Sequence, residues 1–477
     1  MDFTGNNSKI RKKTFKNLSP ERSYNNKIKY QPSKNHYIQL TIDSIRCQNF
    51  IKKNIKKEEQ NQYLNDIKNA IKYYQDLAQY KYIFQDILKQ CVIKECVHNV
   101  WNQWIIRVLG DQKSVKSSLP GHQQAIDDRE ETEIHMKLKL KDCVKNNKIE
   151  SCNCEIKCKE VPKVYDDIIQ FVKEKENEHR KNKNNSLENE QLLQIISDSV
   201  RINPFYRNKK DFNQDFLYLY NDENYTINIL QENYDHISKM FDLNQNPQNI
   251  QSLKTFYIFE LIFNYQFIGG IGYQWAFPPN MMKMLEEELK IECEVFASPL
   301  NHYFDQFHSL FDIDQYFGSY CSCLSNDIKD HIQGIEVNPP FVEKMMVKNS
   351  QRILDHIIQK QMKDEFFICF YCNPWKDSQA YQILAQEKSL VIDTIDFQRL
   401  KHHYFDITKR EFQVSPFNSF VIVIGTSKAK AHYNQLIDIK KRIQNEFKSE
   451  SNLSEKQELQ FGVVFQKEEV EKDTKQE

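Results

Sequence analysis

The sequence has 477 residues, enough for two folded parts, and its 40% hydrophobic residues can bury a sizeable core. The 66 basic and 66 acidic side chains cancel, so no global positive field points to nucleic acid, and any such site must depend on local patches. No apolar run approaches the roughly 20 residues that cross a bilayer and no signal-peptide core opens the chain, which predicts a nuclear protein or, alternatively, a cytoplasmic one.

The first part of the sequence alternates between polar and helical stretches. Residues 1–35 form a basic tail that we expect to be disordered; its Arg11–Lys16 run suits nuclear localisation or RNA contact, with a merely solubilising charge run as the alternative. Residues 36–110 are predicted to be helical. The residues at helical spacing are Leu64, Ile67, Ile71, Tyr74 and Ala78, with Trp101, Ile105 and Leu109 near the end. Residues 111–190 are rich in Lys, Glu and Asn, which predicts a charged low-complexity insertion or linker.

The twelve cysteines fit a reducing compartment as free thiols. Four of them cluster in the charged stretch, at positions Cys143, Cys152, Cys154 and Cys158, but their spacing matches no common zinc module. Cys369 and Cys372 form a lone CxxC with no obvious second pair. We therefore expect no metal site.

Residues 191–265 are predicted to be a helical and hairpin part that packs on the following domain. Phe216–Tyr220 and Tyr225–Ile229 read as the strands of a hairpin, and a helix is expected over Gln231–Phe241. A basic and aromatic patch precedes the hairpin and makes Arg207 a candidate for substrate binding, with an ordinary surface loop as the alternative. Its members are Arg201, Phe205, Tyr206, Arg207, Lys209 and Lys210.

Residues 266–441 hold most of the glycines and prolines of the chain, as expected where loops top a sheet. Strand-like and helical patterns alternate there, which predicts an α/β fold. The expected strands are Ile291–Phe296, Ile332–Val337, Phe366–Tyr371, Ser389–Ile395 and Phe420–Gly425. Residues 442–477 are charged and are predicted to form a tail.

The segment Asn338-Pro339-Pro340-Phe341 follows one of these strands, where open α/β sheets place their ligand chemistry. Two prolines lack N–H groups, so the Asn338 and Pro339 carbonyls can be aimed without competing donors. An adenine stacked on Phe341 can donate its N6 hydrogens to the Asn338 side chain and the Pro339 carbonyl. This arrangement suits methylation of N6 by S-adenosylmethionine, mostly through positioning and preorganised dipoles. The alternative is a strand end that packs a phenylalanine into the core.

Two further stretches contain small residues that let a cofactor approach the backbone. They comprise Gly270, Gly272 and Gln274 in one stretch and Phe296, Ala297, Ser298, Pro299 and Asn301 in the other. Asn301 can hydrogen-bond a polar group of the ligand. For each stretch an ordinary turn is the alternative.

These stretches together resemble the phosphorylated-CTD-interacting factor family, the cap-specific adenosine N6-methyltransferases. The resemblance is carried by Phe296–Asn301, Tyr303-Phe304, Tyr316–Ser319, Gly270–Gln274 with Pro278, Asn338–Phe341 and Asn373-Pro374-Trp375. It implies a Rossmann-like methyltransferase domain, preceded by a mainly helical domain, that transfers methyl from S-adenosylmethionine to N6 of the 2′-O-methyladenosine beside the mRNA cap. Asn338–Phe341 would hold the adenine, the two small-residue stretches the cofactor. Trp375 is a candidate platform for the cap base, or else buries its ring in the sheet edge.

The sequence departs from the family in two respects. Its four tryptophans, Trp101, Trp104, Trp275 and Trp375, do not form the pair that a WW domain requires, so recruitment to the phosphorylated polymerase tail by that route is not expected. After Gly318-Ser319 the chain has Tyr320-Cys321 where the family has a basic residue. The open alternatives are methylation of another RNA adenine or of DNA, and a non-catalytic subunit that binds RNA.

Overall fold

The computed structural model describes residues 36–90, 94–110, 115, 120–145, 150–182, 189–206, 219–221, 224–244, 246–269, 272–320, 322, 328–407 and 410–448. The expected tail at 1–35, Gly270 and Arg207 lie outside these ranges. No helix of the described ranges combines the length and the apolar character needed to span a bilayer.

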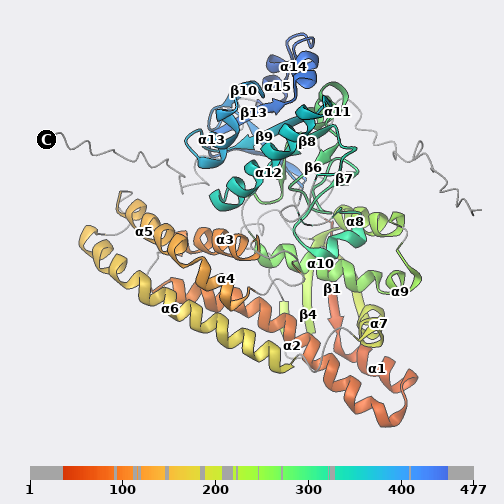
Figure 1. The fold of residues 1–477 in the computed structure, drawn as a ribbon. Coiled ribbons are helices and arrows are strands. Elements are labelled where there is room, and N and C mark those ends of the chain that lie inside the picture. Colours follow the sequence, from red (N-terminus) through yellow and green to blue (C-terminus); the bar gives the residue numbers. More distant parts are fainter. Residues whose placement is uncertain are drawn as a thin grey trace, which may run out of the picture. The chain divides into compact units, whose positions relative to one another are not determined.

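A six-stranded mixed sheet forms the centre of the C-terminal half (Figure 1). Its strands, in spatial order, are β10 (Val391–Phe397), β13 (Ser419–Gly425), β9 (Ile368–Asn373), β8 (Gly334–Val337), β6 (Cys293–Glu294) and β7 (Gln306–Phe307). The pairs β7–β6, β6–β8 and β8–β9 are parallel, and β13 is antiparallel to β9 and β10. The predicted α/β class is confirmed, as are all five predicted strands with shifted bounds.

Burial explains why these strands could be found from the sequence. β8 and β9 are buried at every position and are mostly apolar, with Glu336 and Asn373 as the exceptions, as expected for strands covered on both faces. The helices of this half are α11 (Pro279–Leu289), α12 (Glu343–Met362), α13 (Gln379–Gln386), α14 (Ser427–Tyr433) and α15 (Ile439–Phe447), with a 3₁₀ helix η3 at Asp312–Phe317. A small antiparallel sheet joins β12 (Glu411–Val414), β11 (His403–Asp406) and β5 (Trp275–Ala276).

The folded part extends beyond the predicted boundary at residue 441. Phe447 at the end of α15 is fully buried, with its ring 4.6 Å from that of Phe397 and 5.0 Å from that of Phe277. Lys and Arg residues in α15 hid this apolar face, which repeats at helical spacing through Ile439, Ile443 and Phe447.

A second, four-stranded antiparallel sheet has the order β2-β1-β4-β3. The prediction that residues 36–110 are helical throughout is wrong at its start, because the first eight of these residues form a strand of this sheet. Its strands are β1 (His36–Asp43), β2 (Val200–Tyr206), β3 (Leu219–Asn221) and β4 (Asn224–Leu230). In β1 the buried Leu40 and Ile42 alternate with Gln39 and Thr41, a period of two that favours a strand. β3 and β4 confirm the predicted hairpin, and α8 (Gln231–Leu243) the helix after it.

The remaining helices lie mostly before β2 in the chain. They are α1 (Ser44–Asn54), α2 (Lys57–Leu88), α3 (Lys94–Gly110), α4 (His122–Asp127), α5 (Arg129–Lys145), α6 (Ser151–Asn182) and α7 (Glu190–Ser199), with α9 (Gln248–Gln251) and α10 (Lys254–Ile268) following α8. The predicted apolar stripe of α2 is buried from Ile67 to Ala78, and Trp101, Ile105 and Leu109 of α3 are buried as well.

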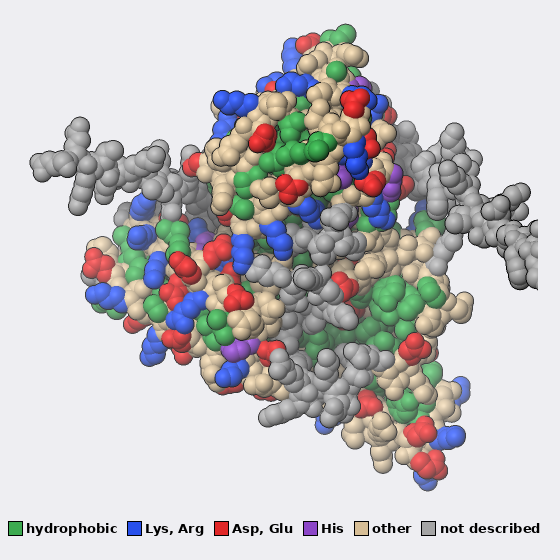
Figure 2. Space-filling model, in the orientation of Figure 1, with side chains coloured by type: hydrophobic (Ala, Val, Ile, Leu, Met, Phe, Trp, Pro, Cys, Tyr) green, Lys and Arg blue, Asp and Glu red, His purple; other side chains and the backbone are tan. Residues whose placement is uncertain are grey.

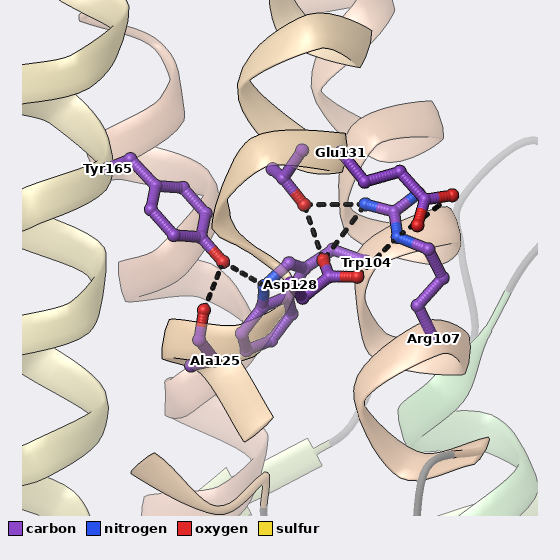
Figure 3. Close-up of polar contacts among 7 residues, drawn as sticks. Trp104, Arg107, Ala125, Asp128, Glu131 and Tyr165 are labelled. Carbon is purple, nitrogen blue, oxygen red and sulfur yellow. Dashed lines mark hydrogen bonds and ion pairs between the residues drawn. The ribbon is translucent and has the colours of Figure 1, made fainter. Parts of the chain in front are cut away.

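Helices α4–α6 occupy the stretch where the charged composition predicted a linker. Their packing includes a buried polar network (Figure 3), in which Arg107 Nε donates to Asp128 Oδ1 at 2.7 Å and both side chains are at most 2% exposed. Tyr165 of α6 donates to the Ala125 carbonyl at 2.7 Å and accepts from Trp104 Nε1 at 3.1 Å. The average charge of this region concealed the buried face of α6, which includes Val161, Tyr165, Ile168 and Val172.

Candidate active site

The Asn338–Phe341 motif lies at the carboxyl end of β8, between that strand and α12. β6 has β7 on one side and β8 on the other, and both are parallel to it. The strands that follow β6 in the chain therefore lie on opposite sides of it, which makes β6 a topological switch point. Such a switch point opens a crevice at the carboxyl ends of the strands. The motif and the Phe296–Asn301 turn, which follows β6, therefore meet at the same edge of the sheet.

The Asn338 side chain is oriented by a backbone carbonyl. Its Nδ2 atom donates to the Trp275 carbonyl oxygen at 3.3 Å. Only the amide nitrogen can donate to a carbonyl, so this contact assigns Oδ1 as the free acceptor end of the side chain. Within the part of the chain that the structure describes, the Pro339 carbonyl accepts no backbone hydrogen bond, whereas the Pro340 carbonyl accepts from Val342 N at 2.7 Å.

Phe341 is half-buried and belongs to a row of aromatic rings. Its ring centroid lies 4.9 Å from that of Phe417 at an interplanar angle of 85°, and 6.3 Å from that of Trp375 at 61°. Phe417 continues the row to Trp275, whose ring is 6.5 Å away and nearly parallel. The ring predicted to stack on adenine is thus held at the surface of an aromatic cluster and is not packed away in the core.

The turn after β9 fixes Trp375 beside this cluster. Asn373 is fully buried, and its Oδ1 accepts from Trp375 N at 2.8 Å while its Nδ2 donates to Ser378 Oγ at 3.0 Å. The Trp375 ring remains half-buried next to Phe341. Its predicted contact with the cap base stays a prediction.

The structure brings together three of the residues expected at the cofactor, from both predicted stretches. Ser298 Oγ lies 2.9 Å from both Gln274 Oε1 and Asn301 Oδ1, and its one proton can bond either of them. Ser298 N also donates to Asn301 Oδ1 at 2.8 Å, so Asn301 closes the turn from within. Phe296 and Ala297 are half-buried, whereas Pro299 is buried.

The stretch before Gln274 depends on a glycine. Gly272 has φ +88°, which residues with a side chain rarely adopt, and its carbonyl accepts from Trp275 N at 3.0 Å. A Cβ atom at Gly272 would lie 3.4 Å from the Trp275 indole. The glycine therefore permits a tight turn directly against the tryptophan that orients Asn338.

Two buried carboxyl groups beneath this edge were not predicted. Glu294 of β6 and Glu336 of β8 face each other in register, and Glu294 Oε2 accepts from the backbone N–H groups of Tyr303 and Phe304 at 2.6 and 3.0 Å. Burial, and next the neighbouring Glu294 carboxyl, hold the pKa of Glu336 well above its usual range. Glu294 thus holds the loop that follows the Ser298 turn.

Sequence reasoning missed two residues of this region, Trp275 of the small sheet and Phe417 of the turn after it. Trp275 is 8% exposed, pairs with Asp406 of β11, and donates from its indole Nε1 to Asp406 Oδ2 at 3.2 Å. Phe417 follows β12 at the turn into β13. The sequence signal for both was their aromatic type next to glycine or proline, which does not reveal a long-range contact.

The departure at Tyr320 has a partial compensation in space. The Nζ atom of Lys329 lies 3.4 Å from the centroid of the Tyr320 ring, so a basic side chain covers this position from another part of the chain. Tyr320 also donates to Gln306 Oε1, at the edge strand β7, at 2.6 Å.

The predicted basic patch is described only in part. Arg201 lies in β2 and forms an ion pair with Asp43, and Arg207 lies outside the described residues. On the face drawn in Figure 2, Lys and Arg side chains are interspersed with Asp and Glu side chains. The arrangement on that face matches the zero net charge of the sequence.

The cysteine groupings do not form a metal cage among the residues that the structure describes. Cys369 and Cys372 are fully buried and belong to opposite faces of β9, where they cannot share one ion. On α6 the Sγ atoms of Cys154 and Cys158 are 3.9 Å apart.

Comparison with known proteins identifies relatives of this region. Residues 236–407, which include every described member of the predicted site, match the family model "Phosphorylated CTD interacting factor 1 WW domain". Within this match Trp275 lies in β5 and Trp375 follows β9, and the match includes five of the six strands of the central sheet, all except β13.

Two curated relatives carry the name mRNA (2′-O-methyladenosine-N(6)-)-methyltransferase. The human protein is 37% identical and the mouse protein 36% identical over 101 residues, which are 20% of this chain and 14% of each relative. The aligned part of the chain thus spans about one seventh of the relatives' length. The family match and these two relatives agree with the resemblance carried by the motifs.

Proposed function

We propose that this protein is an S-adenosylmethionine-dependent N6-methyltransferase that acts on the 2′-O-methyladenosine beside the cap of mRNA. The observation that carries the proposal is the orientation of Asn338: its Nδ2 atom is held by the Trp275 carbonyl, which makes Oδ1 the acceptor end of the side chain. The Phe341 ring of the same motif is half-buried. The names of the human and mouse relatives supply the substrate class.

The chain's own groups are suited to bind and orient an adenine amino group. The N6 lone pair of adenine is delocalised into the ring and is a poor nucleophile. Two acceptors, Asn338 Oδ1 and the Pro339 carbonyl, can grip the two N6 hydrogens and turn the lone pair out of the ring plane. Because these dipoles are fixed before the substrate arrives, they stabilise the charge that develops on nitrogen without reorganisation.

The residues at the switch point fit the proposed cofactor. Gly272 and the Ala297-Ser298 turn present backbone without bulky side chains, and the turn is held by its own hydrogen bonds among Gln274, Ser298 and Asn301. Phe296 and Gln274 are half-buried and can contact the ligand. When bound, S-adenosylmethionine supplies an electrophilic methyl group on a sulfonium.

The wider assignments are part of the same proposal. The 5′ end of capped mRNA is the proposed partner, with Trp375 at the cap base and Arg207 at the RNA, and the nucleus is the proposed location. The catalytic domain is proposed to run from about residue 266 through α15. The motif itself reads only the amino group, so the polymer must be identified by other contacts.

The test is methyl transfer from labelled S-adenosylmethionine to four matched substrates. These are RNAs that begin with capped 2′-O-methyladenosine, capped guanosine or uncapped adenosine, and a DNA that contains adenine. We expect label only on the capped 2′-O-methyladenosine RNA. Label on uncapped RNA or on DNA would retain the chemistry and change the substrate. No label, together with no binding of the cofactor by calorimetry, would refute the proposal and favour a non-catalytic RNA-binding subunit.

A further inference from the structure

Phe417 connects two parts of the site that are distant in sequence. It lies in the turn between β12 and β13, and its half-buried ring packs almost perpendicular to the Phe341 ring, with 4.9 Å between centroids. On its other side it lies near the Trp275 ring, at 6.5 Å and 25°. Trp275 in turn orients the Asn338 amide through its carbonyl. Phe417 therefore contacts Phe341 directly and lies beside Trp275, which orients Asn338. Phe341 and Asn338 are the two residues whose side chains are proposed to hold adenine.

The turn that carries Phe417 is fixed at both ends. Ser415 Oγ donates to the Phe417 carbonyl at 2.9 Å, and Asn418 Oδ1 accepts from Arg399 N at 2.8 Å. Ser419, the first residue of β13, is fully buried, and its Oγ lies 2.8 Å from His402 Nε2. These contacts hold the Phe417 backbone in place, so its ring is a firm support for the Phe341 ring.

We propose that Phe417 is a positioning residue of the adenine site. The proposal rests on the function proposed above and adds a residue that neither the motif nor the relatives' names assign. A base that stacks flat on Phe341 lies nearly perpendicular to the Phe417 ring, because the two rings are inclined by 85°. Phe417 thus stops Phe341 from tilting and limits where along that ring the base can rest.

The geometry predicts an effect on the transfer step more than on cofactor binding. Phe417 contacts Phe341 and Trp275, whereas the Ser298 turn is closed by Gln274 and Asn301. Displacing a reacting atom by about 1 Å can cost about a hundredfold in rate. Loss of the Phe417 ring should therefore reduce kcat on RNA and leave the cofactor Kd nearly unchanged.

The test compares three variants of the full-length protein. Phe417→Leu keeps an apolar side chain and removes the ring, and Phe417→Tyr keeps the ring. Phe412→Leu is the matched control, because Phe412 is an aromatic residue of the same small sheet that is 41% exposed and packs on His403 and Phe405, away from the site rings. The measurements are kcat and KM on capped 2′-O-methyladenosine RNA, the cofactor Kd by calorimetry, and the midpoint of thermal unfolding.

A fluorescent RNA that lacks the methyl-accepting N6 group adds a reading that does not require turnover. RNA with 2-aminopurine in place of the cap-adjacent adenine reports stacking, because its fluorescence is quenched against an aromatic ring. We expect Phe417→Leu to lower kcat by about tenfold or more, weaken the quenching at saturating RNA, and change the cofactor Kd by less than about twofold. Phe417→Tyr should restore both readings, and Phe412→Leu should match the wild type.

The proposal is overturned if Phe417→Leu keeps kcat and quenching within about twofold of the wild type. It is also overturned if kcat, cofactor binding and thermal midpoint all fall together, since Phe417 would then act only in the general core. If the wild-type protein methylates none of the RNA or DNA substrates, the proposed function fails and the role of Phe417 fails with it. Normal transfer by both wild type and Phe417→Leu removes this proposal alone.

Discussion

Replacement of Asn338 by alanine should slow methyl transfer by about tenfold or more while the fold is retained. The substitution removes the acceptor Oδ1 and the 3.3 Å hydrogen bond to the Trp275 carbonyl. That bond is long and joins two neutral groups, so its loss should cost less than about 1 kcal/mol of stability. A tenfold loss of rate corresponds to about 1.4 kcal/mol of transition-state stabilisation, and preorganised polar groups elsewhere contribute about 3 kcal/mol or more.

Two further substitutions at Asn338 separate the acceptor from its orientation. Asn338→Leu keeps the volume and removes both polar atoms, so it should be as slow as Asn338→Ala. Asn338→Asp keeps an acceptor oxygen but loses the donor to the Trp275 carbonyl, and it should transfer faster than either. Single-turnover measurements at saturating cofactor isolate the chemical step. If folded Asn338→Ala, with normal cofactor binding, transfers methyl at the wild-type rate, the assigned role of this side chain is refuted.

Two predictions concern stability. Burial raises the pKa of Asp314, which is fully buried and accepts from Tyr265 Oη at 2.6 Å, from 3.8 to about 7, so the folded state holds a proton that the unfolded state releases. The stability that the protonated Asp314 contributes is fully present below pH 3.8 and is lost as the pH rises through 7. The unfolding free energy of Asp314→Asn, measured by urea titration, should therefore rise by about 4 kcal/mol relative to that of the wild type between these two pH values. A difference in unfolding free energy that does not change with pH would contradict this prediction. Asp128→Ala removes the close ion-pair partner of Arg107, which is 2% exposed, and leaves Glu131 Oε1 at 3.8 Å and the Thr132 hydroxyl, so it should cost about 3 kcal/mol of unfolding free energy. Asp166→Ala breaks a surface pair in which Asp166 is 61% exposed and should cost less than about 1 kcal/mol. Equal losses of stability would argue against the importance of the buried pair.

The position of the Asn338–Phe341 motif at a strand end could be predicted from the sequence, because it depends on local features. Asn338–Phe341 follows a strand that is buried at every position, and the expected strand end is where β8 stops. The Phe296–Asn301 stretch follows β6, which is parallel to β8, so its position at the same sheet edge as the motif could be predicted. Contacts between the two cofactor stretches, such as Ser298 with Gln274, could be expected only in outline.

What the sequence concealed is set by long-range pairing. β7 has two residues and no apolar run of its own, and it exists because Gln306 and Phe307 pair with β6. The linker predicted at residues 111–190 failed for a different reason. The high average charge of these residues predicted a solvated segment, although Tyr165 and its neighbours bury one face of the long helix α6. The contact between Phe417 and Phe341 likewise could not be predicted, because the sequence of the turn does not show which distant residue its side chain meets.

The segment from Gly272 to Trp275 links the cofactor side of the site to the adenine side. Gln274 contacts Ser298, and the next residue, Trp275, orients Asn338. A disturbance of this segment should therefore impair cofactor binding and methyl transfer together, which no change confined to one side would do. Gly272→Ala provides such a disturbance, because it adds a Cβ at φ +88° and 3.4 Å from the indole.

Gly318→Ala is the matched control for this substitution. Gly318 has a similar φ of +94°, but the nearest atom to its added Cβ lies 4.0 Å away, on Asn244. Both substitutions should cost about 1–2 kcal/mol through backbone strain. Only Gly272→Ala should also raise the cofactor Kd and lower kcat, each by several-fold. Equal effects of the two variants on binding and turnover would show that strain alone matters. The segment would then be a passive turn, and the shared support inferred from Trp275 would be wrong.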